Sequence, residues 1–198
     1  MYLDENNFQN FQNVKRDLRE EDFDYVVVSS IELEHASFHK ADFYESKFQE
    51  VKSYFTDYSY ATFIGCTFED CKFVRDRFWK SKFQSCKFTN CSVSDSNMRE
   101  AIFEECSFMK TKISWVDMRE AVISKSNIEK SEFLSCFFEK SAVVDSMLND
   151  VNFEYSYDWT KMEFRGNRGQ KIKYPETGYF ANTNKEFWEK MREIDWYI

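Results

Sequence analysis

Cysteines are the residues of this chain whose spacing most resembles a metal-binding site. Cys66 and Cys71 stand five residues apart, as do Cys86 and Cys91, and regularly spaced cysteines also hold metal ions and iron–sulfur clusters. Thiolate ligation requires several sulfur atoms to converge on one ion. Whether these sulfur atoms converge depends on the elements that carry them.

The other candidates for chemistry are few. His35 and His39 are the only histidines, and no motif pairs a nucleophile with either of them. The segment 166–171 (GNRGQK) lacks the spacing and the Ser or Thr of a phosphate-binding loop, which indicates a turn. We therefore predict that the protein is not an enzyme, and that it holds no metal ion or cofactor.

A strict period of five residues organises the chain. Reading every fifth position from Leu18 to Phe153 gives 28 positions, of which 27 are apolar and 15 are Phe. Ser53 is the only polar residue in this series. A helix would space its buried residues at 3.6 and a strand at 2.0, so each five-residue unit is predicted to form one short side of a coil.

Small side chains occupy the position two residues before each large one. From Val26 to Val151, 24 of these 26 positions hold Ala, Ser, Thr, Cys or Val, and the exceptions are Ile31 and Asp76. This series also contains all six cysteines, so the repeat explains their spacing without a metal ion. The full set is Cys66, Cys71, Cys86, Cys91, Cys106 and Cys136.

The repeating unit is a small residue, a polar residue and a large apolar residue, as in Ala41-Asp42-Phe43 and Ser126-Asn127-Ile128. This pattern, which covers most of the chain, resembles the pentapeptide-repeat family. The resemblance implies an all-β solenoid, a right-handed quadrilateral β-helix in which four units make one 20-residue coil. About seven coils, each about 4.8 Å high, would form a rod on the order of 34 Å long.

Stacking at 20-residue intervals predicts the fate of the thiols. Cys66, Cys86 and Cys106 should lie above one another, with Cβ atoms about 4.8 Å apart, which exceeds the mean of about 3.8 Å in a disulfide. Residues five apart lie on different sides of the coil and cannot share an ion. We therefore expect buried free thiols that serve as small apolar side chains.

Both ends of such a rod need covers that prevent edge-to-edge growth. Residues 1–15 are predicted to form an N-terminal cap, in which Phe8 and Phe11 begin a short turn, and residues 16–164 to form the solenoid. Residues 165–198 are predicted to form a loop and a C-terminal α-helical cap. Thr183-Asn184-Lys185-Glu186 reads as a capping box before a helix from about 184 to 195.

Composition bounds the location and the partners. The N-terminus has no apolar run of the kind found in secretory signals, and no stretch approaches the roughly 20 apolar residues of a membrane span. A cytoplasmic protein is expected. The formal net charge of −8 argues against direct binding to nucleic acid or to an anionic membrane. A protein partner remains.

Arg and aromatic side chains are predicted to gather where the side that carries Phe73 meets the side that carries Phe78. Such residues are enriched at binding hot spots, so this edge is our candidate partner surface, against the alternative of scattered surface aromatics. The residues are Phe55, Tyr60, Arg75, Arg77, Trp79, Arg99, Trp115 and Arg119.

Two functions follow from the resemblance. One is a generic interaction scaffold that presents a rigid surface. The other is mimicry of DNA and binding of a type II topoisomerase, gyrase or topoisomerase IV, as in quinolone protection. DNA would carry roughly 20 charges over this length. The side carrying Phe43 offers seven carboxylates against Lys82 and Lys125, which favours the scaffold. The carboxylates are those of Asp22, Asp24, Asp42, Glu45, Glu104, Glu105 and Asp145.

Two further expectations concern single positions. Asp76 takes a small inward position, where we expect hydrogen bonds from Thr56, Ser96 or nearby backbone amides. Outward apolar residues should stack as a stripe on the acidic side and, with the C-terminal helix, cap the rod and join two chains in a symmetric homodimer. These residues are Ile102, Val122, Ala142, Val144, Phe187, Trp188, Met191, Ile194 and Trp196.

Overall fold

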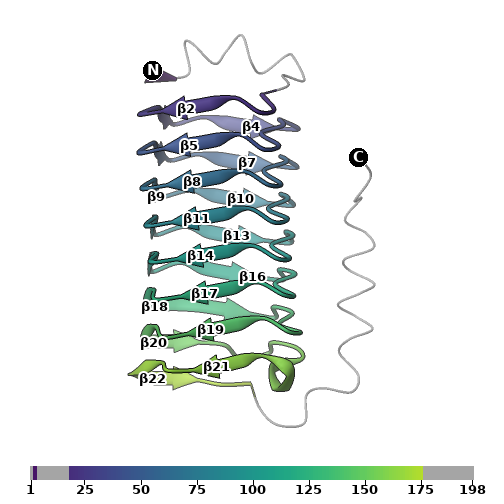
Figure 1. The fold of residues 1–198 in the computed structure, drawn as a ribbon, viewed down its shortest axis with the longest axis vertical. Helices are drawn as coiled ribbons and strands as arrows, with labels where there is room; N and C mark the ends of the chain where they lie inside the picture. Colours follow the sequence, from purple (N-terminus) through teal and green to yellow (C-terminus); the bar gives the residue numbers. More distant parts are fainter. Residues whose placement is uncertain (1, 4–17, 176–198) are drawn as a thin grey trace.

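The computed structural model describes residues 2–3 and 18–175. The chain winds into a single stack of coils, and β1 (Tyr2–Leu3) lies at the opposite end from β22 (Arg168–Lys173) (Figure 1). Each coil has four sides, which we call faces 1 to 4 in chain order. Among the described residues, no helix is long and apolar enough to cross a membrane.

Face 1 is a parallel sheet whose neighbouring strands lie one coil apart in the sequence. Phe63 pairs with Phe83, and Phe83 pairs with Phe103. The strands are β2 (Asp22–Asp24), β5 (Asp42–Tyr44), β8 (Thr62–Ile64), β11 (Lys82–Gln84), β14 (Ile102–Glu104), β17 (Val122–Ser124), β19 (Ala142–Val144) and β21 (Glu163–Arg165).

Faces 2 and 3 form one larger parallel sheet, because the last strands continue from one face to the next. Face 2 holds β3 (Val27–Ser29), β6 (Lys47–Gln49), β9 (Thr67–Glu69), β12 (Lys87–Thr89) and β15 (Ser107–Met109). Face 3 holds β4 (Glu32–Glu34), β7 (Lys52–Tyr54), β10 (Lys72–Val74), β13 (Ser92–Ser94) and β16 (Lys112–Ser114). The joining strands are β18 (Asn127–Leu134), β20 (Met147–Asn152) and β22.

Face 4 has single bridges in place of strands. They run in parallel from Ser37 through Asp57, Arg77, Asn97, Asp117 and Phe137 to Tyr157. A short 3-10 helix, η1 (Trp159–Lys161), takes this side in the last coil.

The stack has about eight coils, one more than the sequence suggested, because the repeat continues beyond Phe153 with one extra residue. Val143 pairs with Phe164 and Leu148 with Gly169, so these partners lie one position further apart in the sequence than the partners in earlier coils. The prediction of a loop from residue 165 was therefore wrong for 165–173, which includes β22. The predicted helix at 184–195 and the turn at Phe8 and Phe11 lie outside the described residues.

The corners explain how the chain turns with only four Gly and one Pro. Every fifth residue from Glu20 to Tyr155 has a positive φ, in the left-handed region. Only Gly65 is a glycine among these corner residues. None is Val, Ile or Thr, the β-branched residues for which this conformation is most costly.

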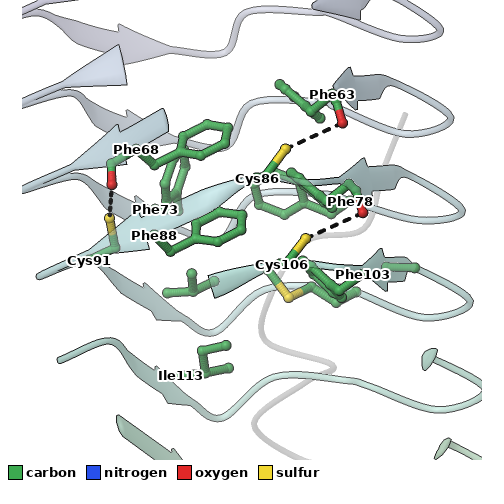
Figure 2. Close-up of a cluster of buried hydrophobic side chains, with 14 of the residues drawn as sticks. Phe63, Phe68, Phe73, Phe78, Cys86, Phe88, Cys91, Phe103, Cys106 and Ile113 are labelled. Atoms are coloured by element: carbon green, nitrogen blue, oxygen red, sulfur yellow. Dashed lines mark hydrogen bonds between the residues drawn. The ribbon is translucent and has the colours of Figure 1, made fainter. Parts of the chain in front are cut away.

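Stacked rings fill the core, as the sequence predicted. On face 1 the rings of Phe63, Phe83 and Phe103 lie parallel, with centroids 4.7 Å apart. Rings on adjacent faces meet edge to face, as do Phe83 and Phe88 at 5.6 Å. Figure 2 labels Phe63, Phe88 and Phe103 among these rings, together with the buried cysteines Cys86, Cys91 and Cys106. Parallel-offset and edge-to-face contacts are the two geometries that aromatic pairs prefer, so coil stacking and ring stacking support each other.

We predict that Phe83→Ala lowers the free energy of unfolding by about 3–5 kcal/mol, because the ring is 2% exposed and contacts rings above and below it. Urea titration measures the change. Lys82→Ala, at the neighbouring exposed position, is the matched control and should change stability by less than about 0.5 kcal/mol. Similar losses in both variants would contradict an inward ring.

A second prediction concerns the corners. Lys110 is an exposed corner residue with φ 50°, whereas Lys87 is the exposed first residue of strand β12. Lys110→Val should lower stability by about 1–2 kcal/mol relative to Lys87→Val, because a β-branched residue strains the left-handed conformation but suits a strand. Thermal and urea unfolding of both variants test this, and equal effects would show that the corners tolerate any residue.

Candidate functional site

The cysteines lie inside the coil as free, buried thiols. The Sγ of Cys86 donates to the carbonyl of Phe63 at 3.3 Å, and Cys91 donates likewise to Phe68 at 3.4 Å (Figure 2). Burial raises the pKa of the Cys136 thiol to about 12. This thiol therefore stays protonated at neutral pH and does not form the nucleophilic thiolate. No group of three His, Cys, Asp or Glu residues in the described part of the chain is placed to hold a metal ion.

The two histidines flank face 4 and contact rings and carboxylates. The ring of His35 stacks on Phe55 with centroids 5.0 Å apart. His39 places Nδ1 3.8 Å from an oxygen of Asp57 and meets the ring of Tyr60 at 5.3 Å. These contacts explain both residues as parts of the surface.

Segment 166–171 is only partly a turn. Gly166 forms a corner with φ 68°, and Arg168 begins β22. A Cβ atom on Gly169 would lie 1.6 Å from the carbonyl oxygen of Leu148, so this glycine allows the last coil to approach its neighbour.

Three buried polar residues form a cluster in the core, across two neighbouring coils. Ser53 and Asp76 are both 0% exposed and Tyr58 is 2% exposed. The hydroxyl groups of Ser53 and Tyr58 lie 3.1 Å apart. The backbone amide of Thr56 donates to Oδ1 of Asp76 at 2.7 Å. The two main departures from the repeat, Ser53 and Asp76, therefore belong to one internal polar cluster.

The carboxyl group of Asp76 accepts a hydrogen bond from a backbone amide, as expected, whereas Ser96 contacts the backbone of Asp76. The hydroxyl of Ser96 accepts from the backbone amide of Asp76 at 3.0 Å. Burial raises the pKa of the Asp76 carboxyl well above its usual value, and the amide of Thr56 and the hydroxyl of Ser53 counter this only in part. Burial, followed by the neighbouring Asp76, also raises the pKa of Tyr58.

On the surface, face 4 and its border with face 1 carry a connected set of aromatic and charged side chains, which we call the face-4 strip. It consists of Tyr60, Trp79, Lys80, Arg99, Glu100, Arg119 and Glu120. These residues come from four successive coils, at corners and at the positions just before them.

Each side chain of the face-4 strip is held by its neighbours. The rings of Tyr60 and Trp79 meet at 5.0 Å, and the ammonium of Lys80 lies 4.7 Å from the centre of the Trp79 ring. The indole nitrogen of Trp79 donates to Glu100 at 3.2 Å. One coil further on, Arg99 pairs with Glu120 at 2.8 Å.

The lower part of the face-4 strip rests on a nearly buried carboxylate. The guanidinium of Arg119 donates to both oxygens of Asp117, from Nε to Oδ1 at 2.9 Å and from Nη2 to Oδ2 at 2.6 Å. The side chain of Asp117 is 4% exposed, and Arg119 also lies over the ring of Phe137 at 5.5 Å. Bidentate pairs of this kind fix the guanidinium plane.

The eight residues predicted for one edge are divided by the structure between face 4 and its two borders. Phe55, Arg75 and Trp115 lie at corners between faces 3 and 4, and Arg75 lies 5.4 Å from the Phe55 ring. Tyr60 lies at a corner between faces 4 and 1. The remaining four, Arg77, Trp79, Arg99 and Arg119, lie on face 4 itself.

Sequence reasoning missed Lys80, Glu100 and Glu120, which orient the predicted residues. Their pairing follows the coil spacing. Lys80 pairs at 3.3 Å with Glu100, which holds the same position in the next coil. Arg99 pairs with Glu120, which lies just after the position equivalent to its own in the next coil. Opposite charges 20 or 21 residues apart in the sequence could have predicted these ion pairs.

Comparison with known proteins agrees with this geometry. Residues 81–174 match the family model described as a pentapeptide repeat region. The same five-residue alternation of buried positions extends from there back to Leu18. Residues 81–174 are therefore a pentapeptide repeat region.

Solved structures that are similar to this chain include QnrB1 and HetL. Full-length QnrB1, a plasmid-mediated fluoroquinolone resistance protein, is 16% identical, with a TM-score of 0.34, over 88% of this chain and 99% of that one. HetL, involved in heterocyst differentiation regulation in the cyanobacterium Nostoc, is 11% identical, with a TM-score of 0.30, over 84% and 92%. No curated protein matches the chain.

The apolar stripe on face 1 is smaller than the sequence predicted. Ile102, Val122 and Ala142 stack in register, and Ile102 is 38% exposed. Val144 was wrongly placed in this stack, because it pairs with Ser124 and lies at the other end of the strand. The four C-terminal residues predicted to join the stripe, Phe187, Trp188, Met191 and Ile194, lie outside the described residues, as does Trp196.

The buried carboxyl yields a prediction about pH. In the folded protein Asp76 keeps a proton that the unfolded chain releases above an ordinary pKa of about 3.9. Its contribution is fully present below that value and is lost as the pH rises towards the raised pKa, by up to about 1.4 kcal/mol per pH unit. Asp76→Asn should lack this loss, so its free energy of unfolding should rise relative to that of the wild type as the pH is raised from about 4 to 8. Urea titrations over this range measure the difference, and parallel curves would show that Asp76 is ionised when folded.

Proposed function

We propose that this protein is a non-enzymatic scaffold of the cytoplasm that binds a protein partner through the face-4 strip. Pentapeptide-repeat proteins are generally structural or interaction proteins. The observation that carries the proposal is the fixed cluster around Trp79, in which Tyr60, Lys80 and Glu100 each contact the indole.

The side chains of the face-4 strip are already oriented before a partner binds, which supports this strip as the binding surface. A tryptophan or arginine that is already held loses less side-chain entropy when a partner arrives, and these residue types dominate binding hot spots. Tyr60 is 37% exposed and the side chain of Arg99 40%, so both present area to a partner while their neighbours hold them.

Binding of a type II topoisomerase, with DNA mimicry, is the second candidate. It draws on the match of residues 81–174 to a pentapeptide repeat region and on the carboxylates of Asp22, Asp24, Asp42 and Glu45 on face 1 and its border. Further along this face, Lys125 pairs with Glu104 at 2.7 Å, and Thr62 and Lys82 continue the row of Asp42. A continuous row of negative charge is therefore lacking on the described part of this face.

Two matched tyrosines distinguish the surfaces. A photo-crosslinking amino acid at position 60 samples the face-4 strip, and one at position 44 samples face 1, because Tyr60 and Tyr44 are 37% and 42% exposed. In cells expressing the protein, we expect an adduct from position 60 that is lost, about tenfold or more, when Trp79→Ala and Arg99→Ala are added. Adducts from position 44 alone would contradict the proposal, and gyrase or topoisomerase IV subunits among them would establish the second candidate.

A further inference from the structure

Charge is distributed unevenly between the two ends of the rod. In the first coil, residues 19–38, six carboxylates stand against one arginine, and we call these residues the acidic end. In the last coil, residues 159–175, five cations stand against one carboxylate, Glu163, and we call these residues the basic end. All of these charged side chains are exposed.

Most of the carboxylates at the acidic end and most of the cations at the basic end form no ion pair within the described part of the chain. At the acidic end, Glu20 pairs with Lys40 at 3.0 Å and Glu34 lies 3.9 Å from His35. The other four carboxylates have no ion pair within residues 18–175. They are Glu21, Asp22, Asp24 and Glu32.

The basic end shows the complementary surplus. Lys161 lies 3.4 Å from both Glu139 and Asp158, and Arg165 pairs with Glu163. Arg168, Lys171 and Lys173 form no ion pair with any part of the chain that the structure describes. Farther from the ends, by contrast, pairs such as Lys112 with Glu132 at 3.5 Å join successive coils.

Among the described residues, the strands at both ends are also edges of the sheet. On face 1 the terminal strands are β2 and β21, and their central rings, Phe23 and Phe164, are only half-buried, unlike Phe63 and Phe83 within the stack. At the acidic end β1 pairs with β3 and so extends face 2, but it does not cover β2. Terminal strands with unpaired backbone groups and half-buried rings are surfaces that readily gain a partner.

The two ends cannot satisfy one another within one rod, because the intervening coils hold them apart (Figure 1). We propose that the basic end of one copy of this protein binds the acidic end of a second copy, so that the rods associate head to tail. The occupant is a second copy because this same chain carries both complementary surfaces. The contact joins two different surfaces, so it permits chains of copies, unlike a symmetric dimer.

This proposal predicts association that depends on salt. Exposed charges are screened over about 10 Å at 0.1 M salt and over about 3 Å at 1 M. Sedimentation velocity of the full chain at 20 mM salt should show a mass that rises with concentration, and the association should weaken at least tenfold at 0.5 M.

Charge reversal identifies the surfaces. Arg168→Glu with Lys173→Glu should weaken self-association at least tenfold, and mixing this variant with Asp24→Lys/Glu32→Lys should restore association between the two variants. Lys82→Glu with Lys87→Glu is the matched control, since it alters the charge equally at exposed positions in the middle of the rod and should leave association unchanged.

Other results overturn the proposal. A chain that stays monomeric at low salt and high micromolar concentration rules it out. So does a dimer of fixed mass that is insensitive to salt and to both pairs of end variants, which would instead indicate the symmetric dimer that the sequence predicts. If mixing the two variants does not restore association, the charges at the two ends act on separate partners.

Discussion

Every structural feature of this protein depends on one contact, the stacking of each five-residue unit on the unit one coil away. Backbone amides donate to the carbonyls of the adjacent coil, as Lys82 does to Ala61 at 2.9 Å, while rings such as Phe63 and Phe83 stack at 4.7 Å. Both contacts need the same coil height, which fixes the parallel register. Stability is therefore built from contacts between neighbouring coils, and each outward position is set beside its equivalent one coil away.

This constraint also determines which positions are free to vary. Inward positions must fit the ring stack or the space beneath it, and corner residues must accept a left-handed backbone. The other outward positions need neither fit the ring stack nor adopt a left-handed backbone. Charge pairs between coils, such as Arg99 with Glu120, can therefore accumulate there without disturbing the core. The buried polar cluster at Ser53, Tyr58 and Asp76 is different, because burial makes its hydrogen bonds obligatory.

The sequence predicted the coil because its period of five admits neither helix nor strand spacing, and the inward series survived almost unchanged from Leu18 to Phe153. It failed beyond Phe153, where one added residue shifts the register and Gly169 replaces a large apolar residue, so the last coil escaped the pattern. Surface predictions were weaker for a physical reason. The period shows which residues point inward but not at which outward position the chain turns a corner, so Tyr60 and Phe55 were assigned to one edge although they lie on opposite borders of face 4.

A rod of this kind has two classes of surface with different consequences. Side surfaces repeat at each coil, so a partner that binds along face 4 gains contacts in steps of one coil, and Trp79, Arg99 and Arg119 lie at equivalent positions on three successive coils. End surfaces occur once, and within residues 18–175 their charges without an ion pair and their half-buried rings arise because the described stack stops there. Repetition therefore suits the sides to holding an extended partner, whereas termination suits the ends to ordering one rod against the next. The two contacts use separate residues, so one copy can form both at once.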